Sequence, residues 1–498
     1  MHRTKRWLWR AVKAGAVASV TIVVVRAFDA RELPALRAWH REAPESELRA
    51  GELDGMTLPQ YLRREAEVFR ETRAIEARIE PADRTPANRY FAGSLVNPGR
   101  LPRDWNRTFE VEPESLRGGA LLIHGLTDAP YSVRPLAEVL RREGFYGLCL
   151  RMPGHGTVPA GLVRADWQDW LAAVRLGMRH VRGRIGPGKP LVLAGYSNGG
   201  ALAVKYSLDS LAASSLPRAD RLILLSPMIG VSSFARLGRL SGFLGTLPGL
   251  ARASWTDVVP EYNPFKYNSF PAHAARQSYE LTTALDKQLK EAAKTGGIGG
   301  LPPILTFQSL ADATVVVEAD TVRLYDRLTA GGSELVLFDL NRRAYLRPLL
   351  HPTLDGWLAQ RFQGPARRYT LSLVTNATPE TSDVVLRSRA AGTGAVSTRP
   401  LGLAWPPQIY SLSHVAVPFP PTDPLYGIAP DPSEFYGARL GALSPRGERK
   451  VLALPIENLM RMSCNPFFPY MEGRVVEWIG AGGVTPAPPR PSPAETRR

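Results

Sequence analysis

Residues 195–199 read G-Y-S-N-G, a pentapeptide of the form G-x-S-x-G. An apolar run precedes it at residues 191–194, and a helix-like stretch follows at residues 200–208. A serine between a strand and a helix lies on a sharp turn, which small residues on both sides make sterically possible. Its hydroxyl then projects beyond the strand, above the positive end of the helix dipole. The pattern predicts that Ser197 is a nucleophile, and the alternative is a glycine-rich turn without chemistry.

A second buried-strand pattern, residues 118–126 (GGALLIHGL), lies upstream of the serine. A serine that attacks an acyl group needs two backbone N–H donors for the oxyanion that develops. The pair that fits this chain is the N–H of Asn198, directly after the serine, and the N–H of Leu126, in the loop after the earlier strand. We interpret His124 as a residue that holds this loop. We interpret His155, which lies in the later stretch GLCLRMPGHG, as a turn residue at the pocket rim.

Three pieces of the chain, HGLTDAP, MPGHG and GYSNGG, follow one another in sequence. In this order and spacing they resemble the serine α/β-hydrolases, specifically the bacterial carboxylesterase and monoacylglycerol lipase-like branch. The resemblance covers about residues 121–340 and extends to His414. It implies the α/β-hydrolase fold, with a mostly parallel, eight-stranded sheet, helices on both faces and a lid inserted after the sixth strand.

An acidic residue is expected next, because the chain order in this fold is serine, then Asp or Glu, then histidine. Residues 303–309 predict a strand, and Asp312 follows it in a loop. The resemblance implies an aspartate in this setting, although Gln308 and Ser309 stand where the family usually has a glycine. Asp312 would accept the Nδ1–H of the base and fix its tautomer. The alternative for Asp312 is a plain helix cap.

Two histidines are candidates for the base, and both lie beyond the acid in an insertion or after it. The insertion spans about residues 341–405. His351 has the spacing found in simpler members of the family, but it lies in an apolar run. His414 lies in S-L-S-H-V, which resembles the loop that carries the family's base. We predict His414 as the base, which requires the insertion to return the chain to the sheet edge, and we keep His351 as the alternative.

Composition limits the other classes of protein. The chain has 498 residues, 44% of them hydrophobic, so one large catalytic domain with additions fits better than several equal ones. Its two cysteines are distant and have no metal-ligand spacing with histidine, so we expect no metal and no cofactor. The net charge of +16 is scattered along the chain without a recognition module, so we expect no nucleic-acid partner. Attraction to anionic membrane lipid is the alternative meaning of this charge.

The N-terminal residues 1–27 contain basic positions followed by an apolar stretch, residues 11–25, broken only by Lys13. Counted from Trp7, this stretch approaches the length of a membrane span, and Lys13 is able to snorkel. We favour an uncleaved single-pass anchor with its basic flank in the cytoplasm and the catalytic domain on the periplasmic (extracytoplasmic) side. The alternative is a secretory signal that is cleaved, which would leave a secreted protein.

The remaining segments complete the predicted domain organisation. Residues 28–110 predict a helical arm, with a helix at 58–79, that packs on the core. Residues 111–480 predict the hydrolase domain. Within it, about residues 228–300 suit either a lid that opens at an apolar interface or a buried pair of cap helices.

Two further patterns lie toward the C-terminus. Residues 369–375 and 383–388 predict the two strands of a β-hairpin before His414. The Pro-rich tail, residues 481–498, lacks the apolar content to pack and is predicted to be disordered.

The resemblance implies cleavage of carboxylic esters, either acyl-glycerol or other lipid-like esters, through an acyl-enzyme on Ser197. An acyltransferase would use the same residues and differ only in excluding water. A peptidase of the same fold is a further possibility, but the sequence shows no acidic cluster to bind an amine. An alternative from a different functional class is a catalytically inactive, membrane-anchored scaffold. The intact serine turn argues against this alternative.

Overall fold

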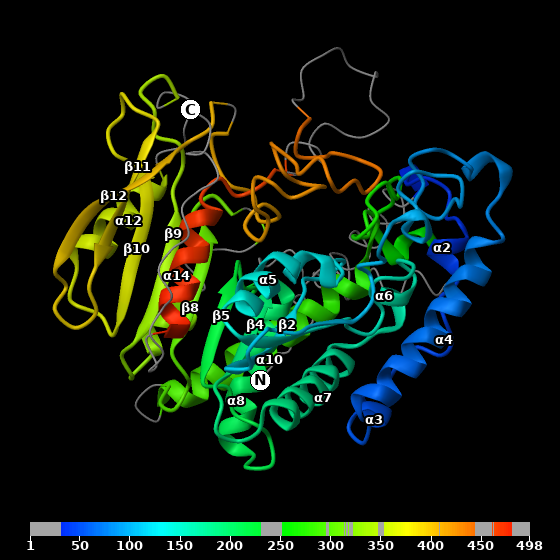
Figure 1. Cartoon of the computed structure of the whole chain (residues 1–498), viewed down its shortest axis with the longest axis horizontal. Coiled ribbons are helices and arrows are strands. Elements are labelled where there is room, and N and C mark those ends of the chain that lie inside the picture. Colours follow the sequence, from blue (N-terminus) through cyan, green and yellow to red (C-terminus); the bar gives the residue numbers. More distant parts are fainter. Residues whose placement is uncertain are drawn as a thin grey trace, which may run out of the picture.

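A ten-stranded mixed sheet forms the centre of the computed structural model (Figure 1), in the order β1-β3-β2-β4-β5-β8-β9-β10-β11-β12. The structure describes residues 31–230, 251–294, 298–312, 314, 317, 322–346, 353–407, 409–443, 461 and 463–480. Within these residues the sheet has ten strands, so the expectation of eight strands is wrong. Seven strands precede residue 341, and the insertion that follows it adds three more to the same sheet.

Seven neighbouring strands of the sheet run parallel, and antiparallel strands occupy both edges. Residues buried on both faces of a parallel sheet read as continuous apolar runs, which is the pattern of β2 to β5. The parallel strands are β3 (Phe145–Leu150), β2 (Gly118–Ile123), β4 (Leu191–Tyr196), β5 (Arg221–Leu225), β8 (Ile304–Ser309), β9 (Ser333–Phe338) and β10 (Tyr369–Asn376). Antiparallel pairs are made by β1 (Phe109–Val111) with β3, by β11 (Asp383–Arg389) with β10, and by β12 (Val396–Ala404) with β11.

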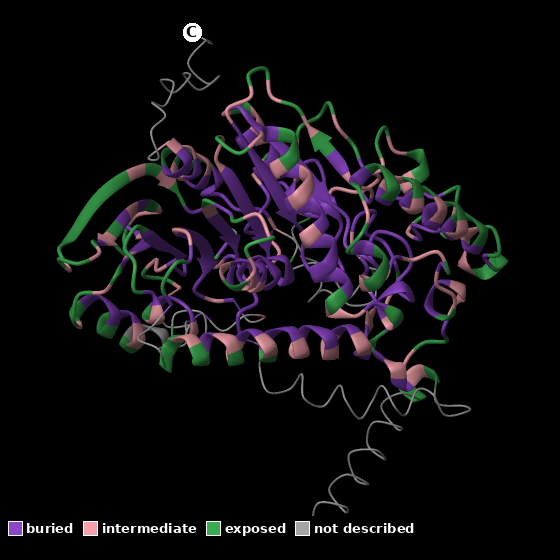
Figure 2. Cartoon of the chain, turned by 90° about the horizontal axis from the view of Figure 1, so that it is seen from below, coloured by how far each residue is buried: buried purple, intermediate pink, exposed green. Residues whose placement is uncertain are grey.

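Helices cover both faces of the sheet, as expected, and each face has its own buried apolar cluster. Alternate side chains of one strand enter opposite clusters: Leu121 and Ile123 enter one, and Leu122 enters the other. The centre of the sheet is buried between these layers (Figure 2). One face carries α7 (Trp167–Ile185), α8 (Asn198–Ala212), α10 (Ala272–Lys294) and α12 (Thr353–Gln363), and the other carries α5 (Arg134–Arg142) and α14 (Phe468–Gly480).

The N-terminal arm packs on the core, in agreement with the sequence. Its helices are α2 (Ala38–Arg41), α3 (Ala50–Leu53) and α4 (Leu58–Glu76). Arg151, which follows β3 and is fully buried, forms ion pairs with Glu47 at 2.9 Å and with Glu65 of α4 at 3.2 Å. The hydroxyl of Tyr61 donates to the backbone oxygen of Arg151. Charged and apolar contacts therefore fix the arm against the end of a central strand.

The insertion after β9 begins with α12 and then contributes β10, β11 and β12. Strands β10 and β11 lie where the sequence placed them and pair antiparallel, with Leu373 opposite Arg387. The sequence left open whether this hairpin extends the sheet, shapes the pocket or contacts a partner. In the structure β10 also pairs parallel with β9, and β12 extends the sheet further. The hairpin is thus a continuation of the central sheet.

The segment between β5 and β8 contains a short antiparallel pair, β6 (Trp255–Asp257) with β7 (Phe270–Pro271), followed by α10. Residues 231–250, which are part of the expected lid at about 228–300, lie outside the described residues, as do 1–27, 481–498 and His351. In the part of the chain that the structure describes, no helix has the length and apolar character that a membrane span requires.

Candidate active site

Ser197 lies on the predicted sharp turn between β4 and α8. Its backbone has φ +55° and ψ −117°, a conformation that side-chain-bearing residues rarely adopt. The flanking glycines permit the turn. A Cβ on Gly195 would lie 2.3 Å from the carbonyl oxygen of Gly199, and one on Gly199 would lie 2.3 Å from that of Ile123. The turn therefore holds the serine at the carboxyl end of a central strand, where side chains from neighbouring strands meet.

His414 and Asp312 are in direct contact. The Nδ1 atom of His414 lies 2.7 Å from Oδ2 of Asp312, and both side chains are buried. The other carboxylate oxygen of Asp312 accepts the backbone N–H of Thr314 at 2.8 Å. An imidazole that donates from Nδ1 leaves Nε2 as an acceptor. Among the described residues Nε2 of His414 has no hydrogen-bond partner.

Ser197 and His414 line the same cavity, which has a volume of about 280 Å³. No hydrogen bond between these two side chains is present in the described part of the chain. Catalytic hydrogen bonds are often long without substrate and shorten when it binds. The cavity lining also includes Leu126, Thr127, Asp128, Tyr196, Met228, Asp257, Tyr262, Lys266, Tyr267, Asn268, Phe270, Thr314, Val415 and Arg461.

The two predicted backbone donors lie beside the serine. Leu126 lines the cavity, and Asn198 is the first residue of α8. Neither backbone N–H has an acceptor among the residues that the structure describes. The side chain of Asn198 accepts a hydrogen bond from the hydroxyl of Ser278 at 2.8 Å, which ties the start of α8 to α10. Both N–H groups are thus available to an oxyanion.

Lys266 is a residue of this site that sequence reasoning missed. It lies between β6 and β7, lines the cavity, and donates from Nζ to Thr127 Oγ1 and to Asp128 Oδ1, both at 2.9 Å. A lone lysine after aromatic residues carries no pattern that would have pointed to it. Tyr262, an aromatic residue from the same stretch, also lines the cavity.

His124 and His155 are buried and structural. Nε2 of His124 accepts the backbone N–H of Met152 at 3.0 Å, so Nδ1 carries the proton and donates to the oxygen of Gly125 at 2.9 Å. Burial holds the pKa of His124 well below its ordinary value. Burial also lowers the pKa of His155 to about 3. The interpretation of His155 as a rim residue is wrong, because it is 1% exposed and is not among the residues that line the cavity.

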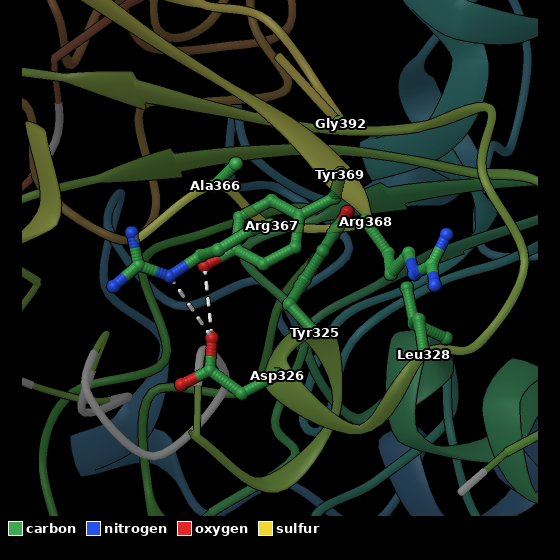
Figure 3. A pocket seen from close by; sticks show the side chains of 8 residues that line it. All are labelled: Tyr325, Asp326, Leu328, Ala366, Arg367, Arg368, Tyr369 and Gly392. Carbon is green, nitrogen blue, oxygen red and sulfur yellow. Dashed lines mark hydrogen bonds and ion pairs between the residues drawn. The ribbon is translucent and has the colours of Figure 1, made fainter. Parts of the chain in front are cut away.

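A larger cavity, of about 530 Å³, lies elsewhere, at the first residues of β10 and beside Tyr325 (Figure 3). In this cavity the carboxylate of Asp326 accepts a hydrogen bond from the hydroxyl of Tyr369 at 3.1 Å and forms an ion pair with Arg367 at 3.5 Å. Tyr369 is the first residue of β10, whereas Ser197 follows the last residue of β4, which runs in the same direction. The two cavities therefore lie at opposite ends of the parallel strands, this one at the amino ends and the cavity of Ser197 at the carboxyl ends. None of the predicted site residues lines this second cavity.

Metal ligands and cysteines give no further site within the described residues. No group of three or more His, Cys, Asp or Glu residues there is arranged to hold a metal ion. Cys149, in β3, and Cys464 are both buried and free. Burial raises the pKa of both thiols, which keeps them protonated.

The parallel sheet, the serine turn at its carboxyl edge and the paired Asp and His define an α/β-hydrolase-like protein. In agreement, the sequence profile described as "Serine aminopeptidase, S33" (Hydrolase_4) matches residues 114–341. Over that segment the chain is similar to this family of α/β-hydrolases.

Individual known proteins also have sequence or structural similarity to parts of this chain. Over 87 residues, 17% of this chain, the sequence is 39% identical to a thermostable monoacylglycerol lipase from Bacillus sp. (strain H-257). The chain spans a third of the length of that relative. Among solved structures, one reported for the metagenome-derived lipolytic enzymes LipS and LipT is 22% identical, with a TM-score of 0.38 over 52% of this chain and 97% of its own. The monoacylglycerol lipase of Paleococcus ferrophilus is 16% identical, with a TM-score of 0.35 over 51% and 98%.

Proposed function

We propose that this chain is a serine hydrolase that cleaves carboxylic esters through an acyl-enzyme on Ser197. One observation carries the proposal: His414 is held by Asp312 through Nδ1 and lines, with Ser197, a single cavity. A nucleophile and a base at one cavity, with a third group that orients the base, are the components of acyl transfer.

The proposed reaction uses only side chains and backbone groups of this chain. Ser197 Oγ attacks the ester carbonyl while Nε2 of His414 takes its proton, and Asp312 stabilises the imidazolium that forms. The N–H groups of Leu126 and Asn198 bind the tetrahedral oxyanion, and each such donor contributes about 3 kcal/mol. His414 then protonates the leaving alcohol, and water attacks the acyl-enzyme by the same route in reverse. No step requires a metal or a cofactor.

Acyl-glycerol or other lipid-like esters are the proposed substrates. The name of the relative from Bacillus, a monoacylglycerol lipase, supports this choice. Met228, Phe270 and Val415 supply apolar surface in the cavity, which suits an acyl chain. Asn268 and Tyr262 supply polar groups in the same lining, which suit the hydroxyls of an alcohol.

An aminopeptidase is the second candidate, and one carboxylate favours it. The matching family is described as serine aminopeptidase, and such an enzyme needs a negative group to bind the free amine of its substrate. Asp257 lines the cavity, and no Lys, Arg or His among the described residues pairs with it. The test is hydrolysis of aminoacyl p-nitroanilides by the parent and by Asp257→Asn. Loss of this activity in the variant, with an unchanged rate of p-nitrophenyl ester hydrolysis, would favour the peptidase.

The acyltransferase and the inactive scaffold are separated from the hydrolase by product analysis. Addition of an alcohol acceptor to the assay would yield a new ester if the acyl-enzyme excludes water. A scaffold would leave Ser197 unlabelled by a fluorophosphonate probe, whereas both enzymes would be labelled.

The test of the proposed function measures hydrolysis of p-nitrophenyl esters of graded chain length. Ser197→Ala and His414→Ala should each lower kcat by a factor of about 1,000 or more, whereas His351→Ala should keep the parent rate. Loss of activity in His351→Ala with retention in His414→Ala would overturn the base assignment. An unlabelled, inactive parent protein would overturn the hydrolase itself.

We further propose that residues 1–27 anchor a hydrolase domain, residues 111–480, on the extracytoplasmic side of a membrane. The apolar stretch 11–25 with its basic flank supports this proposal. Carbonate extraction of membranes from expressing cells tests it, because an anchored chain stays in the pellet and a cleaved, secreted one does not.

A further inference from the structure

The turn after β2 carries one of the proposed oxyanion donors, and it is strained. Thr127, directly after Leu126, has φ +65°, a value that a side-chain-bearing residue seldom adopts. Such a conformation is unfavourable and persists only where its surroundings hold it. The contacts that hold this turn therefore decide where the Leu126 N–H lies.

Those contacts come from Lys266 and its neighbour, in the segment between β5 and β8. Lys266 Nζ donates to the side chains of Thr127 and Asp128, and the backbone N–H of Tyr267 donates to the oxygen of Thr127 at 2.8 Å. Lys266 and Asp128 also form an isolated antiparallel bridge. Backbone and side-chain bonds from two successive residues thus fix the strained turn.

Asp128 itself lies beside the nucleophile. A Cβ placed on Gly125 would lie 2.7 Å from Oδ2 of Asp128 and 3.2 Å from Cβ of Ser197, so both groups border the same small volume. Asp128 is 6% exposed. A buried carboxylate at this place opposes any negative charge that develops on the substrate, and Lys266 is the cation that pairs with it.

From these contacts we infer that Lys266 is a positioning residue for the oxyanion site: it holds the turn of Leu126 and Thr127, and it neutralises Asp128 beside Ser197. The inference rests on the proposed function, since it concerns the charge that forms during attack by Ser197. Its effect belongs to the transition state, because the ester carbonyl is uncharged before attack. Loss of the ammonium group therefore lowers kcat and leaves KM near its parent value.

A double-mutant cycle separates the electrostatic role from a structural one. Lys266→Met removes the charge and leaves Asp128 unpaired, and we expect kcat for a p-nitrophenyl ester to fall roughly 100-fold. Asp128→Asn alone removes the opposing charge and should change kcat less than tenfold. The double variant should recover much of the loss of Lys266→Met, because no unpaired carboxylate remains beside the oxyanion. A purely structural role predicts losses that add.

Two controls make the outcome decisive. Lys290→Met removes an exposed lysine that pairs with Asp286 on α10, and it should leave kcat and KM unchanged. Lys266→Arg keeps the charge and should retain more activity than Lys266→Met. A double variant no better than Lys266→Met, or a rise in KM with kcat intact, overturns the inference while esterase activity of the parent stands. An inactive parent overturns the proposed function instead.

Discussion

Asp312 and His414 are separated by 102 positions in the sequence, yet their side chains meet at 2.7 Å. The contact forms because β8 ends just before Asp312, and because the chain returns to this region before His414. Strands β10 to β12 carry the intervening chain outward to the far edge of the sheet. The segment after β12 brings it back beside the residues that follow β9, where the backbone N–H of Asn341 donates to the oxygen of Tyr410 at 2.8 Å.

Substitution of Asp312 by Asn should remove most activity without unfolding the protein. The amide keeps the size of the carboxylate, but it favours the wrong imidazole tautomer and cannot stabilise the imidazolium. We expect kcat for p-nitrophenyl esters to fall by about 10⁴-fold, with KM little changed.

The matched control is Asp326→Asn, at the second cavity, which should keep the parent kcat because it lies at the other edge of the sheet. Equal activity of Asp312→Asn and the parent would show that another carboxylate orients the imidazole of the base.

Substitution of Gly199 by Ala should damage both folding and activity. The added methyl group would lie 2.3 Å from the carbonyl oxygen of Ile123 and 2.7 Å from that of His124, and backbone atoms of a central strand have little room to move. We expect a loss of about 2 kcal/mol or more in the free energy of unfolding, measured by urea denaturation.

Gly183→Ala is the control, because a Cβ there has no atom within 4 Å and alanine favours the helix. A Gly199→Ala protein as stable and active as the parent would contradict the tight approach of β2 to the serine turn.

The serine turn could be predicted from sequence because its cause is local: an apolar strand, small residues and a helix lie within a short stretch around Ser197. The pairing of Asp312 with His414 needed the family resemblance as well, since spacing alone favoured His351. Lys266 could not be found, because its role depends on contacts with Thr127 and Asp128, residues far away in the sequence. Strand β12 could not be predicted from the sequence either. Its residues are mostly exposed, and polar and apolar residues do not alternate along it as they do in a strand that is buried on one face.

Stability should depend on pH through His155. Burial lowers the pKa of this imidazole from 6.5 to about 3, so between these values the unfolded chain binds a proton that the folded protein does not. The contribution of the neutral His155 to the free energy of unfolding is therefore fully present above about pH 6.5. It is lost as the pH falls toward 3, by about 1.4 kcal/mol per pH unit.

The comparison of parent with His155→Asn isolates this effect, because the amide of Asn still donates to the oxygen of Pro153 but does not titrate. Burial raises the pKa of Glu76 to about 7, which stabilises the folded state as the pH falls, but it acts equally on both proteins. Urea denaturation at pH 7, 6 and 5 should show a steeper loss for the parent. Parallel curves would contradict an imidazole that stays neutral in the folded state.

The last prediction concerns Arg151, which joins the N-terminal arm to the hydrolase core. Its side chain is fully buried and pairs with Glu47 and Glu65, so Arg151→Ala would leave two buried carboxylates without their cation. Burial already raises the pKa of Glu65, which shows how costly its charge is there. We expect a loss of about 3–5 kcal/mol in the free energy of unfolding.

The exposed pair of Arg184 with Glu112 supplies the control, and Arg184→Ala should cost less than about 1 kcal/mol. Replacement of Arg151, Glu47 and Glu65 together by Met, Gln and Gln should restore much of the stability, since no unpaired charge then remains buried. If Arg151→Ala were as stable as Arg184→Ala, the arm would be held by its apolar contacts alone. In that case Tyr61 and Leu58, which are buried in the main apolar cluster, would be the residues to test.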